Sequence, residues 1–314
     1  MRAGEALMSS LTSDPQPDPF LATQRRAEAG ARLVLRGIGL NVVLAAVKIA
    51  GGVVGNTYAL IADGAESTLD VLSSTLVWAG FRVAGRPPDA NHPYGHGKAE
   101  SLSALAVALF IFAMAVWVAI AAVREIITPH HGPAWWTLPL LAAIIGVKAA
   151  FSRRLRQAGL MHDSTALGVE AQHHWSDALT SAAAFVGIAI ALVGGPGWES
   201  ADDWAALAAC GVIAYNGVSM MSRALGDVMD TAVPESFEGE IRVLALTVPG
   251  VRALHRMRVR KSGLSYLVDI QIRVDGELTV RAGHDIAHRV KDVLIASAAH
   301  RITDVIVHVE PAAE

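Results

Sequence analysis

Three ionisable residues, Glu170, His173 and Asp177, interrupt an apolar segment that is long enough to cross a lipid bilayer. Because residues three or four apart project from the same side of an α-helix, these side chains form one polar stripe. Ionisable groups at membrane depth are costly, and they usually face a bundle interior or a wet pathway. A single histidine could be an ordinary packing residue, but three ionisable groups on one stripe favour a functional site.

An earlier apolar segment carries a matching stripe, formed by Asp63, Glu66 and Asp70. Glu66 and Asp70 have the same spacing as His173 and Asp177, so the two helices can offer oxygen and nitrogen ligands to one divalent cation. Carboxylates gathered at membrane depth without a cation would destabilise the bundle. A proton relay or a hydrogen-bonded polar core is the alternative, although imidazole with carboxylate suits Zn²⁺ and related metals.

The remaining polar residues of these helices have smaller expected roles. We place Asp63 and Glu170 around the ligands or along the access path. His174 is not expected to be a ligand, because it lacks the four-residue spacing to Asp177. Lys48 and Lys148 also fall inside predicted helices, where they either snorkel or form ion pairs.

A loop between the second and third apolar segments suggests another metal site, because Asp89, His92 and His96 lie close together there. The overlapping run Gly95–Lys98 is not a Walker A phosphate loop, since that motif needs a glycine where this chain has His92. The sequence also lacks the His-Glu-x-x-His run of a zinc protease. Neither a nucleotide site nor a hydrolase is therefore expected.

The composition favours a membrane protein. The chain has 314 residues, of which 53% are hydrophobic and 18% are charged, whereas soluble domains are usually about a quarter charged. The net charge of −3 argues against a nucleic-acid partner. Cys210 is the single cysteine, which excludes an internal disulfide and a multi-thiolate site, so a metal would need histidines and carboxylates.

Six apolar segments reach the roughly 20 residues that a spanning helix needs. They are predicted over residues 33–54, 58–84, 99–126, 134–156, 164–193 and 202–226. Basic residues gather before the first segment and in the second and fourth connections, which places both termini in the cytoplasm and the protein in the inner cell membrane. Residues 1–31 are expected to be a disordered leader without a cleavable signal peptide, ahead of a membrane domain over residues 32–230.

Residues 231–314 are richer in charge and predict a cytoplasmic α+β domain. The predicted elements are a helix over Pro234–Leu246, strands over Leu254–Arg260 and Ser265–Val274, a helix over 279–298, and a strand over Thr303–Val309. This order of helix, strand, strand, helix and strand places both helices on one face of a small sheet. The core of such a domain is small, so burial against a second copy is expected.

Taken together, these motifs resemble the cation diffusion facilitator family. The resemblance rests on Ala62-Asp63, Ser67 and Asp70, on His92-Pro93-Tyr94-Gly95-His96-Gly97-Lys98-Ala99-Glu100, on His173-His174-x-Ser176-Asp177, on Pro249-Gly250-Val251 and on Asp304-Val305-x-Val307-His308. It covers the chain from about Arg32 to Pro311. It implies a homodimeric antiporter with six transmembrane helices and a metallochaperone-like C-terminal domain, which exports Zn²⁺ or related divalent ions in exchange for protons.

The resemblance also implies site residues. The transport site would consist of Glu66, Asp70, His173 and Asp177. The loop site would consist of Asp89, His92 and His96, and the C-terminal site of His255, His284, His308 and Glu310. Lys98 and Asp230 match a charge interlock at the membrane boundary, for which the alternative is a solvated surface pair worth less than about 1 kcal/mol.

The chain departs from the family pattern at two positions. Glu66 stands where bacterial relatives usually have aspartate and vertebrate zinc transporters have histidine, so the choice among Zn²⁺, Fe²⁺, Mn²⁺, Co²⁺ and Cd²⁺ stays open. Gln271 stands where the family has a bridging histidine, so the number of metals in the C-terminal domain stays open as well.

The expected mechanism is alternating access with protons and metal competing for the same groups, because metal ligands must be deprotonated. His173 is the expected proton carrier, since histidine ordinarily changes its charge near neutral pH. The alternatives are a passive divalent-cation channel, a metal-sensing membrane protein and a metal-activated membrane enzyme. The enzyme would need a nucleophile or general base beside an open coordination position, and no such motif is present.

Overall fold

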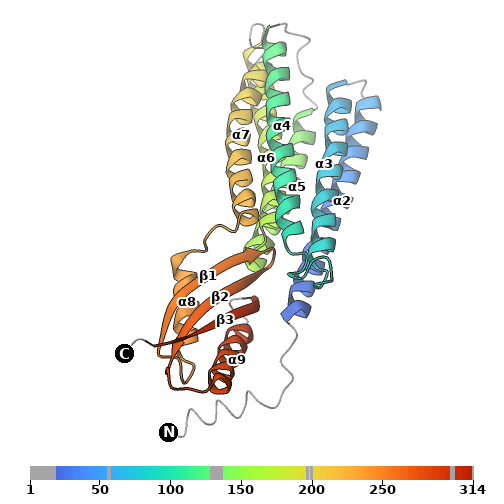
Figure 1. The fold of residues 1–314 in the computed structure, drawn as a ribbon. Coiled ribbons are helices and arrows are strands. Elements are labelled where there is room, and N and C mark those ends of the chain that lie inside the picture. The colour runs from blue at the N-terminus through green and yellow to red at the C-terminus, as the bar shows by residue number, and fades with distance from the viewer. Residues whose placement is uncertain are drawn as a thin grey trace. The chain divides into compact units, whose positions relative to one another are not determined.

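The computed structural model describes residues 19–54, 58–127, 137–195, 198, 201–297 and 301–312. The chain divides into two compact units, one over Arg26–Thr231 and one that contains Ala232–Glu314. The first unit is helical, and the second combines helices with a three-stranded sheet (Figure 1).

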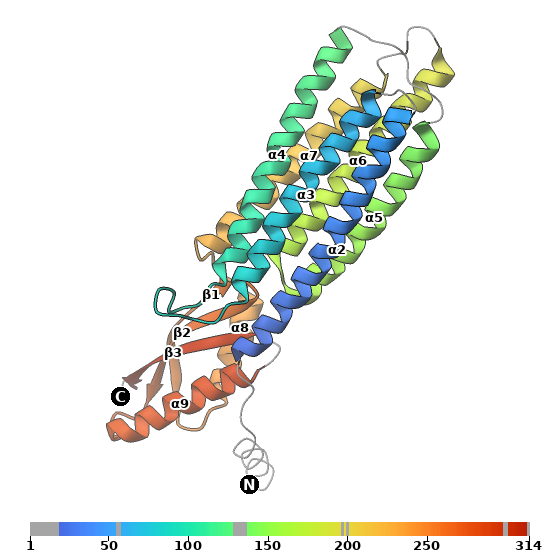
Figure 2. The same cartoon turned by 90° about the vertical axis from the view of Figure 1, so that its right-hand side faces the viewer.

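Long helices build the first unit. Within the described ranges they are α2 (Pro19–Val54), α3 (Tyr58–Ala84), α4 (Lys98–Ile127), α5 (Thr137–His162), α6 (Thr165–Gly194) and α7 (Ala201–Val228). Each contains most of one apolar segment predicted from the sequence, and they run alongside one another as a bundle (Figures 1 and 2). Among the described residues, two stretches, Phe20–Ala50 and Lys98–Arg124, could cross a membrane by length and composition alone, which is weak evidence by itself.

Helix α2 begins at Pro19, well before the predicted apolar segment. The expected disorder of residues 1–31 is therefore wrong for residues 19–31, which are helical, whereas residues 1–18 lie outside the described part. Packing explains the extension, because Ala27 and Ala31 are almost fully buried in spite of the charged residues around them. Gly30 lies against α3, where an added Cβ would be 2.8 Å from the ring of Phe81.

The other helices of the bundle pack in pairs. Helix α4 packs on α7, α5 on α6, α6 on α7 and α3 on α4. The contact between α3 and α4 is close, since a Cβ added at Gly80 would lie 2.5 Å from Cβ of Ser103. Small residues permit such close helix packing in membrane proteins.

Buried polar groups fix the start of α6. The hydroxyl of Ser164 accepts a hydrogen bond from the backbone N–H of Leu167 at 3.1 Å. Oε1 of the buried Glu100 accepts from the N–H of Ala166 at 2.8 Å and from Oγ of Ser164 at 2.6 Å. A carboxylate at a helix N-terminus is favourable because it meets unpaired N–H groups and the positive end of the helix dipole. This cap therefore sets the position of the helix that carries Glu170, His173 and Asp177.

The second unit has the predicted order of elements. They are α8 (Glu235–Leu246), β1 (Ala253–Ser262), β2 (Ser265–Val274), α9 (Val280–Ala296) and β3 (Ile302–Pro311). Strand β2 lies between the other two, antiparallel to β1 and parallel to β3. The parallel pairing of β2 and β3 requires a long connection, and α9 provides it.

The strands alternate between an apolar and a polar face. Val268, Ile270 and Ile272 of β2 are buried in one core with Ile241 of α8 and Val290 of α9. Both helices therefore cover the same face of the sheet, as the sequence predicts. The opposite face carries polar residues, among them Arg256, Arg258, Gln271 and His308.

Candidate metal centre

Asp70 of α3 lies beside His173 and Asp177 of α6 inside the helical bundle. Nε2 of His173 is 3.3 Å from Oδ1 of Asp70, and Nδ1 of His173 is 3.8 Å from Oδ1 of Asp177. Each residue offers one ligand atom, and these atoms lie within 4.8 Å of one another. The side chains of Asp70 and His173 are 5% exposed and that of Asp177 is 18% exposed. This cluster, called the bundle site below, could hold a cation away from bulk water.

Two residues of the matching stripe on α3 cannot be placed in the same way. The backbone of Asp63 and Glu66 belongs to α3, with Glu66 one turn before Asp70, but both side chains lie outside the described residues. The role of Glu66 as a fourth ligand thus stays a prediction. His130 and His131, two histidines in the connection between α4 and α5, also lie outside the described residues.

A lysine of α5 lies between the two aspartates of the bundle site. Nζ of Lys148 is 2.8 Å from Oδ2 of Asp177 and 3.3 Å from Oδ2 of Asp70. The side chain of Lys148 is 3% exposed. Of the two roles left open for this lysine, snorkelling and ion pairing, the structure has ion pairing. A charged residue within an apolar helix was the available signal, but the sequence did not indicate its partners.

Two serines of α3 extend this polar region, and the sequence reasoning did not single them out. Oγ of Ser73 donates to the backbone carbonyl of Asp70 at 3.0 Å and lies 3.3 Å from Nε2 of His173. Oγ of Ser74 donates to Oε1 of Glu170, which is fully buried. Their spacing of three and four residues from Asp70 was the signal that could have identified them.

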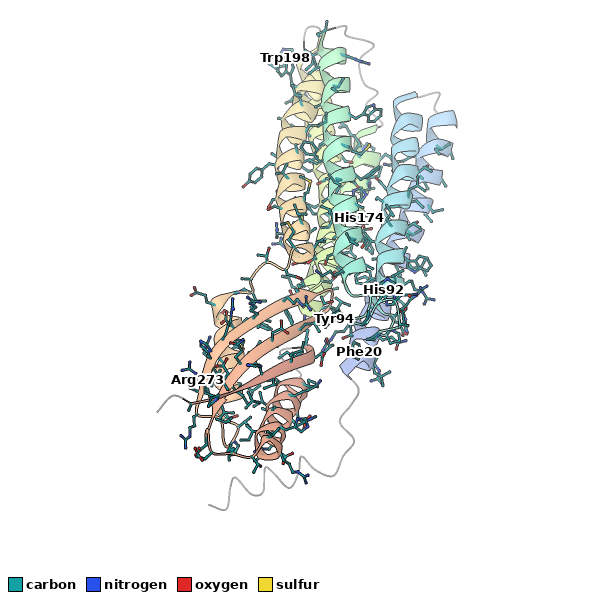
Figure 3. The ribbon with its side chains drawn as sticks, viewed as in Figure 1. Phe20, His92, Tyr94, His174, Trp198 and Arg273 are labelled. Atoms are coloured by element: carbon teal, nitrogen blue, oxygen red, sulfur yellow. The ribbon has the colours of Figure 1, made fainter. Side chains whose placement is uncertain are left out.

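His174 has a different environment from His173. Its side chain is fully buried, and its ring meets the ring of Phe151 edge-to-face at a centroid distance of 5.0 Å. Nε2 of His174 lies 3.7 Å from Oε1 of Glu170. His174 is not among the three groups that converge at the bundle site, and Figure 3 shows it inside the helical bundle.

The loop before α4 brings Asp89, His92 and His96 together. Oδ1 of Asp89 is 3.3 Å from Nδ1 of His92, and Oδ2 of Asp89 is 3.3 Å from Nε2 of His96. One ligand atom from each lies within 4.8 Å of the others, which makes a second candidate metal site, called the loop site below. Figure 3 shows His92 and Tyr94 on this loop.

Backbone hydrogen bonds hold the aspartate of the loop site in place. Oδ1 of Asp89 accepts from the N–H of His92 at 2.7 Å and from the N–H of Asn91 at 2.9 Å. The hydrogen bond from His92 lowers the pKa of the Asp89 carboxyl below its usual value, because it stabilises the ionised form. The two backbone hydrogen bonds also fix the orientation of the Asp89 carboxylate. Gly95 completes the loop with a φ of 80°, a conformation that favours glycine.

The predicted interlock between Lys98 and Asp230 corresponds to an observed ion pair. Nζ of Lys98 is 2.9 Å from Oδ1 of Asp230 and donates to the carbonyl of Val228 at 2.9 Å. The two side chains are 42% and 36% exposed, so the pair itself is worth less than about 1 kcal/mol. It connects the start of α4 to the end of α7.

The residues expected to form a C-terminal site are only partly brought together. Nδ1 of His255 lies 2.8 Å from Oε2 of Glu310, and Nε2 of His308 lies 3.8 Å from Oε1 of Glu310. The ring of His284 contacts the ring of His288, one turn along α9, at a centroid distance of 4.4 Å. Among the described residues, no three of these side chains place ligand atoms within 4.8 Å of one another, as the residues of the bundle and loop sites do.

Comparison with known families identifies the chain. Residues 34–229 match the family described as cation efflux transmembrane domain, and residues 233–312 match the family described as cation efflux protein, cytoplasmic domain, also called ZT_dimer. The chain therefore belongs to the cation efflux proteins, the cation diffusion facilitators. It is a membrane protein with a cytoplasmic C-terminal domain.

Individual relatives cover most of the chain. It is 28% identical to the manganese efflux system protein MneP of Bacillus subtilis, over 91% of this chain and 97% of that protein. It is 30% identical to metal tolerance protein C1 of Arabidopsis thaliana, over 94% of this chain, and the match spans 65% of the plant protein. Solved structures of the MamM CTD are also similar, one at 32% identity over 25% of this chain and 98% of that chain, with a TM-score of 0.24.

Proposed function

We propose that this protein exports a divalent transition-metal ion from the cytoplasm. Asp70, His173 and Asp177 are the ligands of the transported ion, and Glu66 is the fourth. The observation that carries the proposal is the convergence of three ligand atoms, from two helices, within 4.8 Å inside the bundle. The name of the relative MneP, a manganese efflux system protein, supports the same direction of transport. Carboxylate and imidazole suit Zn²⁺, Mn²⁺, Fe²⁺, Co²⁺ and Cd²⁺.

Protons are the proposed coupling ion. The metal can bind only when His173 is neutral and the aspartates are ionised, so protons and metal compete for the same atoms. His173 is the proposed proton carrier, since it contacts both aspartates of the bundle site. If the site opens alternately to each side of the membrane, an inward proton gradient drives the metal outward.

The proposed arrangement in the membrane has six spanning helices and cytoplasmic N- and C-termini, in the inner cell membrane. The six long helices α2 to α7 and the distribution of basic residues support it. We further propose a homodimer that associates through the C-terminal domain, since this domain matches the family called ZT_dimer. The loop site and the residues His255, His284, His308 and Glu310 are proposed to bind regulatory metal.

Transport by reconstituted protein tests the function. In proteoliposomes with a pH-sensitive dye inside, wild type should move metal in one direction and protons in the other. Asp70→Ala and Asp177→Ala should each reduce the rate by at least about 100-fold, because each removes a ligand from the transition-metal site. Wild-type rates in either variant would refute the assignment of the bundle site.

Asp163→Asn is a matched control for these variants. Asp163 lies between α5 and α6 at a φ of 50°, a conformation that asparagine also tolerates, so the rate should not change.

The same proteoliposomes separate antiport from a passive channel. A channel would move metal at the same rate with and without a proton gradient, so equal rates under the two conditions would favour the channel alternative. A panel of metals on wild type and Glu66→Asp would show whether the longer side chain sets the preference.

A further inference from the structure

Each aspartate of the bundle site divides its two carboxylate oxygens between two partners. Oδ1 of Asp70 and Oδ1 of Asp177 face the imidazole of His173, at 3.3 and 3.8 Å. Oδ2 of both aspartates faces Nζ of Lys148, at 3.3 and 2.8 Å. The ammonium group therefore lies against oxygens that a metal ion would also use.

The positive charge of Lys148 affects both the stability of the two aspartates and the binding of a metal ion to them. A buried carboxylate without a partner is strongly destabilising, and the ammonium of Lys148 supplies a partner to both aspartates when no metal is bound. A divalent ion coordinated by Asp70 and Asp177 would bring two further positive charges next to that ammonium. Since like charges at contact distance repel strongly in a buried site, the metal and Lys148 cannot keep the same carboxylate oxygens.

Stability alone is a weak explanation for the lysine. Replacing a buried ion pair by apolar residues is often neutral or stabilising, so an apolar side chain on α5 with neutral partners would serve packing as well. The aspartates are needed as metal ligands under the proposed function, and a cation that leaves them reversibly is then useful.

We propose that Lys148 is an internal counter-cation that a metal ion must displace from Asp70 and Asp177 in order to bind, and that returns when the metal leaves. This inference rests on the proposed function. Lys148 thus acts through the two aspartates. It competes with the metal for their oxygens and so lowers the metal affinity, which allows the ion to be released. A lysine that only stabilises the bundle would not have this effect on affinity.

The test is metal binding to the full-length protein in detergent, with Mn²⁺ and Zn²⁺ as probes. Metal binding at the bundle site is taken as the difference between the metal bound by wild type and the metal bound by Asp177→Asn. Lys148→Met has a similar length without the charge and should bind at least about 10-fold more tightly than wild type. Lys148→Arg keeps the charge and can hold both carboxylates with its planar fork, so it should bind about 10-fold more weakly. A purely structural role would weaken binding in both variants.

Arg154→Met is the control, because it removes a positive charge from an exposed position of the same helix and should bind as wild type does. Opposite shifts of Lys148→Met and Lys148→Arg support the inference, and any other pattern in the two folded variants overturns it. If Lys148→Met does not fold, judged by size-exclusion chromatography, the neutral variant Lys148→Gln takes its place with the same expected tighter binding, and wild-type or weaker binding of Lys148→Gln overturns the inference. If Asp177→Asn removes no binding, the proposed function itself fails.

Discussion

At the scale of residues, both ring nitrogens of His173 face possible hydrogen-bond acceptors. Ser73 donates its hydroxyl proton to the carbonyl of Asp70, which leaves its oxygen free to accept from Nε2 of His173 at 3.3 Å. Oδ1 of Asp70 is an acceptor at the same distance from Nε2. Nδ1 of His173 faces Oδ1 of Asp177 at 3.8 Å, so each ring nitrogen lies beside a carboxylate and either one can carry the proton of the neutral ring.

The carboxyl of Asp89 gives a prediction about pH. Its pKa is lowered in the folded protein by the N–H of His92. The contribution of this hydrogen bond to stability is therefore present above the unfolded pKa of about 3.9 and is lost as the pH falls through the lower folded pKa. Carbon-13 NMR of aspartate-labelled protein should place the Asp89 titration below about 3.9.

Two variants separate the charge of Asp89 from its role as an acceptor. Asp89→Asn keeps an oxygen for the N–H of His92 and should preserve the loop while weakening metal binding there. Asp89→Ala removes both and should also loosen the loop, measured by faster hydrogen exchange of Asn91 and His92. A titration midpoint at or above about 3.9 for Asp89 would contradict the assignment of its hydrogen bonds.

At the scale of elements, α6 is the helix on which the bundle site depends, and its start is held by a side chain from α4. Glu100 accepts from the N–H of Ala166 and from Ser164, so α4 and α6 are joined by buried hydrogen bonds. His173 and Asp177 lie about two to three turns further along α6. A shift of this helix would move His173 and Asp177 relative to Asp70 on α3.

Glu100→Ala should destabilise the bundle, because it removes a negatively charged cap from the positive end of α6. We expect a loss of about 2 kcal/mol in the free energy of unfolding, measured by denaturant titration in detergent micelles. Glu100→Gln keeps an acceptor without the charge and should lose less. Glu28→Ala is the control, since Glu28 takes part in an exposed pair with Arg32 and should change stability by less than about 0.5 kcal/mol. Equal stability of the Glu100→Ala and Glu28→Ala proteins would show that the cap is unimportant.

At the scale of the whole molecule, a membrane unit that contains the bundle site is joined to a cytoplasmic unit with exposed histidines and a carboxylate. His255 contacts Glu310, which also lies near His308, on a small domain whose core comes from one sheet face and two helices. The opposite sheet face is polar. A second copy of the chain could complete a metal site for which each copy alone offers too few convergent ligands.

We therefore expect Zn²⁺ to strengthen association of two copies, measured as a lower dimer dissociation constant in analytical ultracentrifugation. Substitution of both His255 and His308 by alanine should reduce the effect of Zn²⁺ by about 10-fold or more, since it removes two ligands. Asp177→Ala should still respond to Zn²⁺, because it changes only the bundle site. A dissociation constant that is the same with and without Zn²⁺ would count against this role of the domain.

Much of the fold could be predicted from the sequence because its signals are local. Apolar length predicts long helices, and alternation predicts the strands of the C-terminal domain. The helical extension to Pro19 was missed, since charged residues conceal the buried positions of Ala27 and Ala31. Burial of such small residues depends on contacts with other helices, and no local pattern reports it.

At the bundle site, too, the local features could be predicted from the sequence and the contacts between helices could not. The sequence by itself determined that His173 and Asp177 share one face of a helix, and that Asp70 belongs to a second helix with a matching stripe. Spacing along a helix is a local property, so periodicity is enough to establish it. Only the tertiary structure decided that Lys148 of α5 lies between the two aspartates and that Glu170 turns to Ser74. The physical reason is that the faces that meet are chosen by packing across the whole bundle.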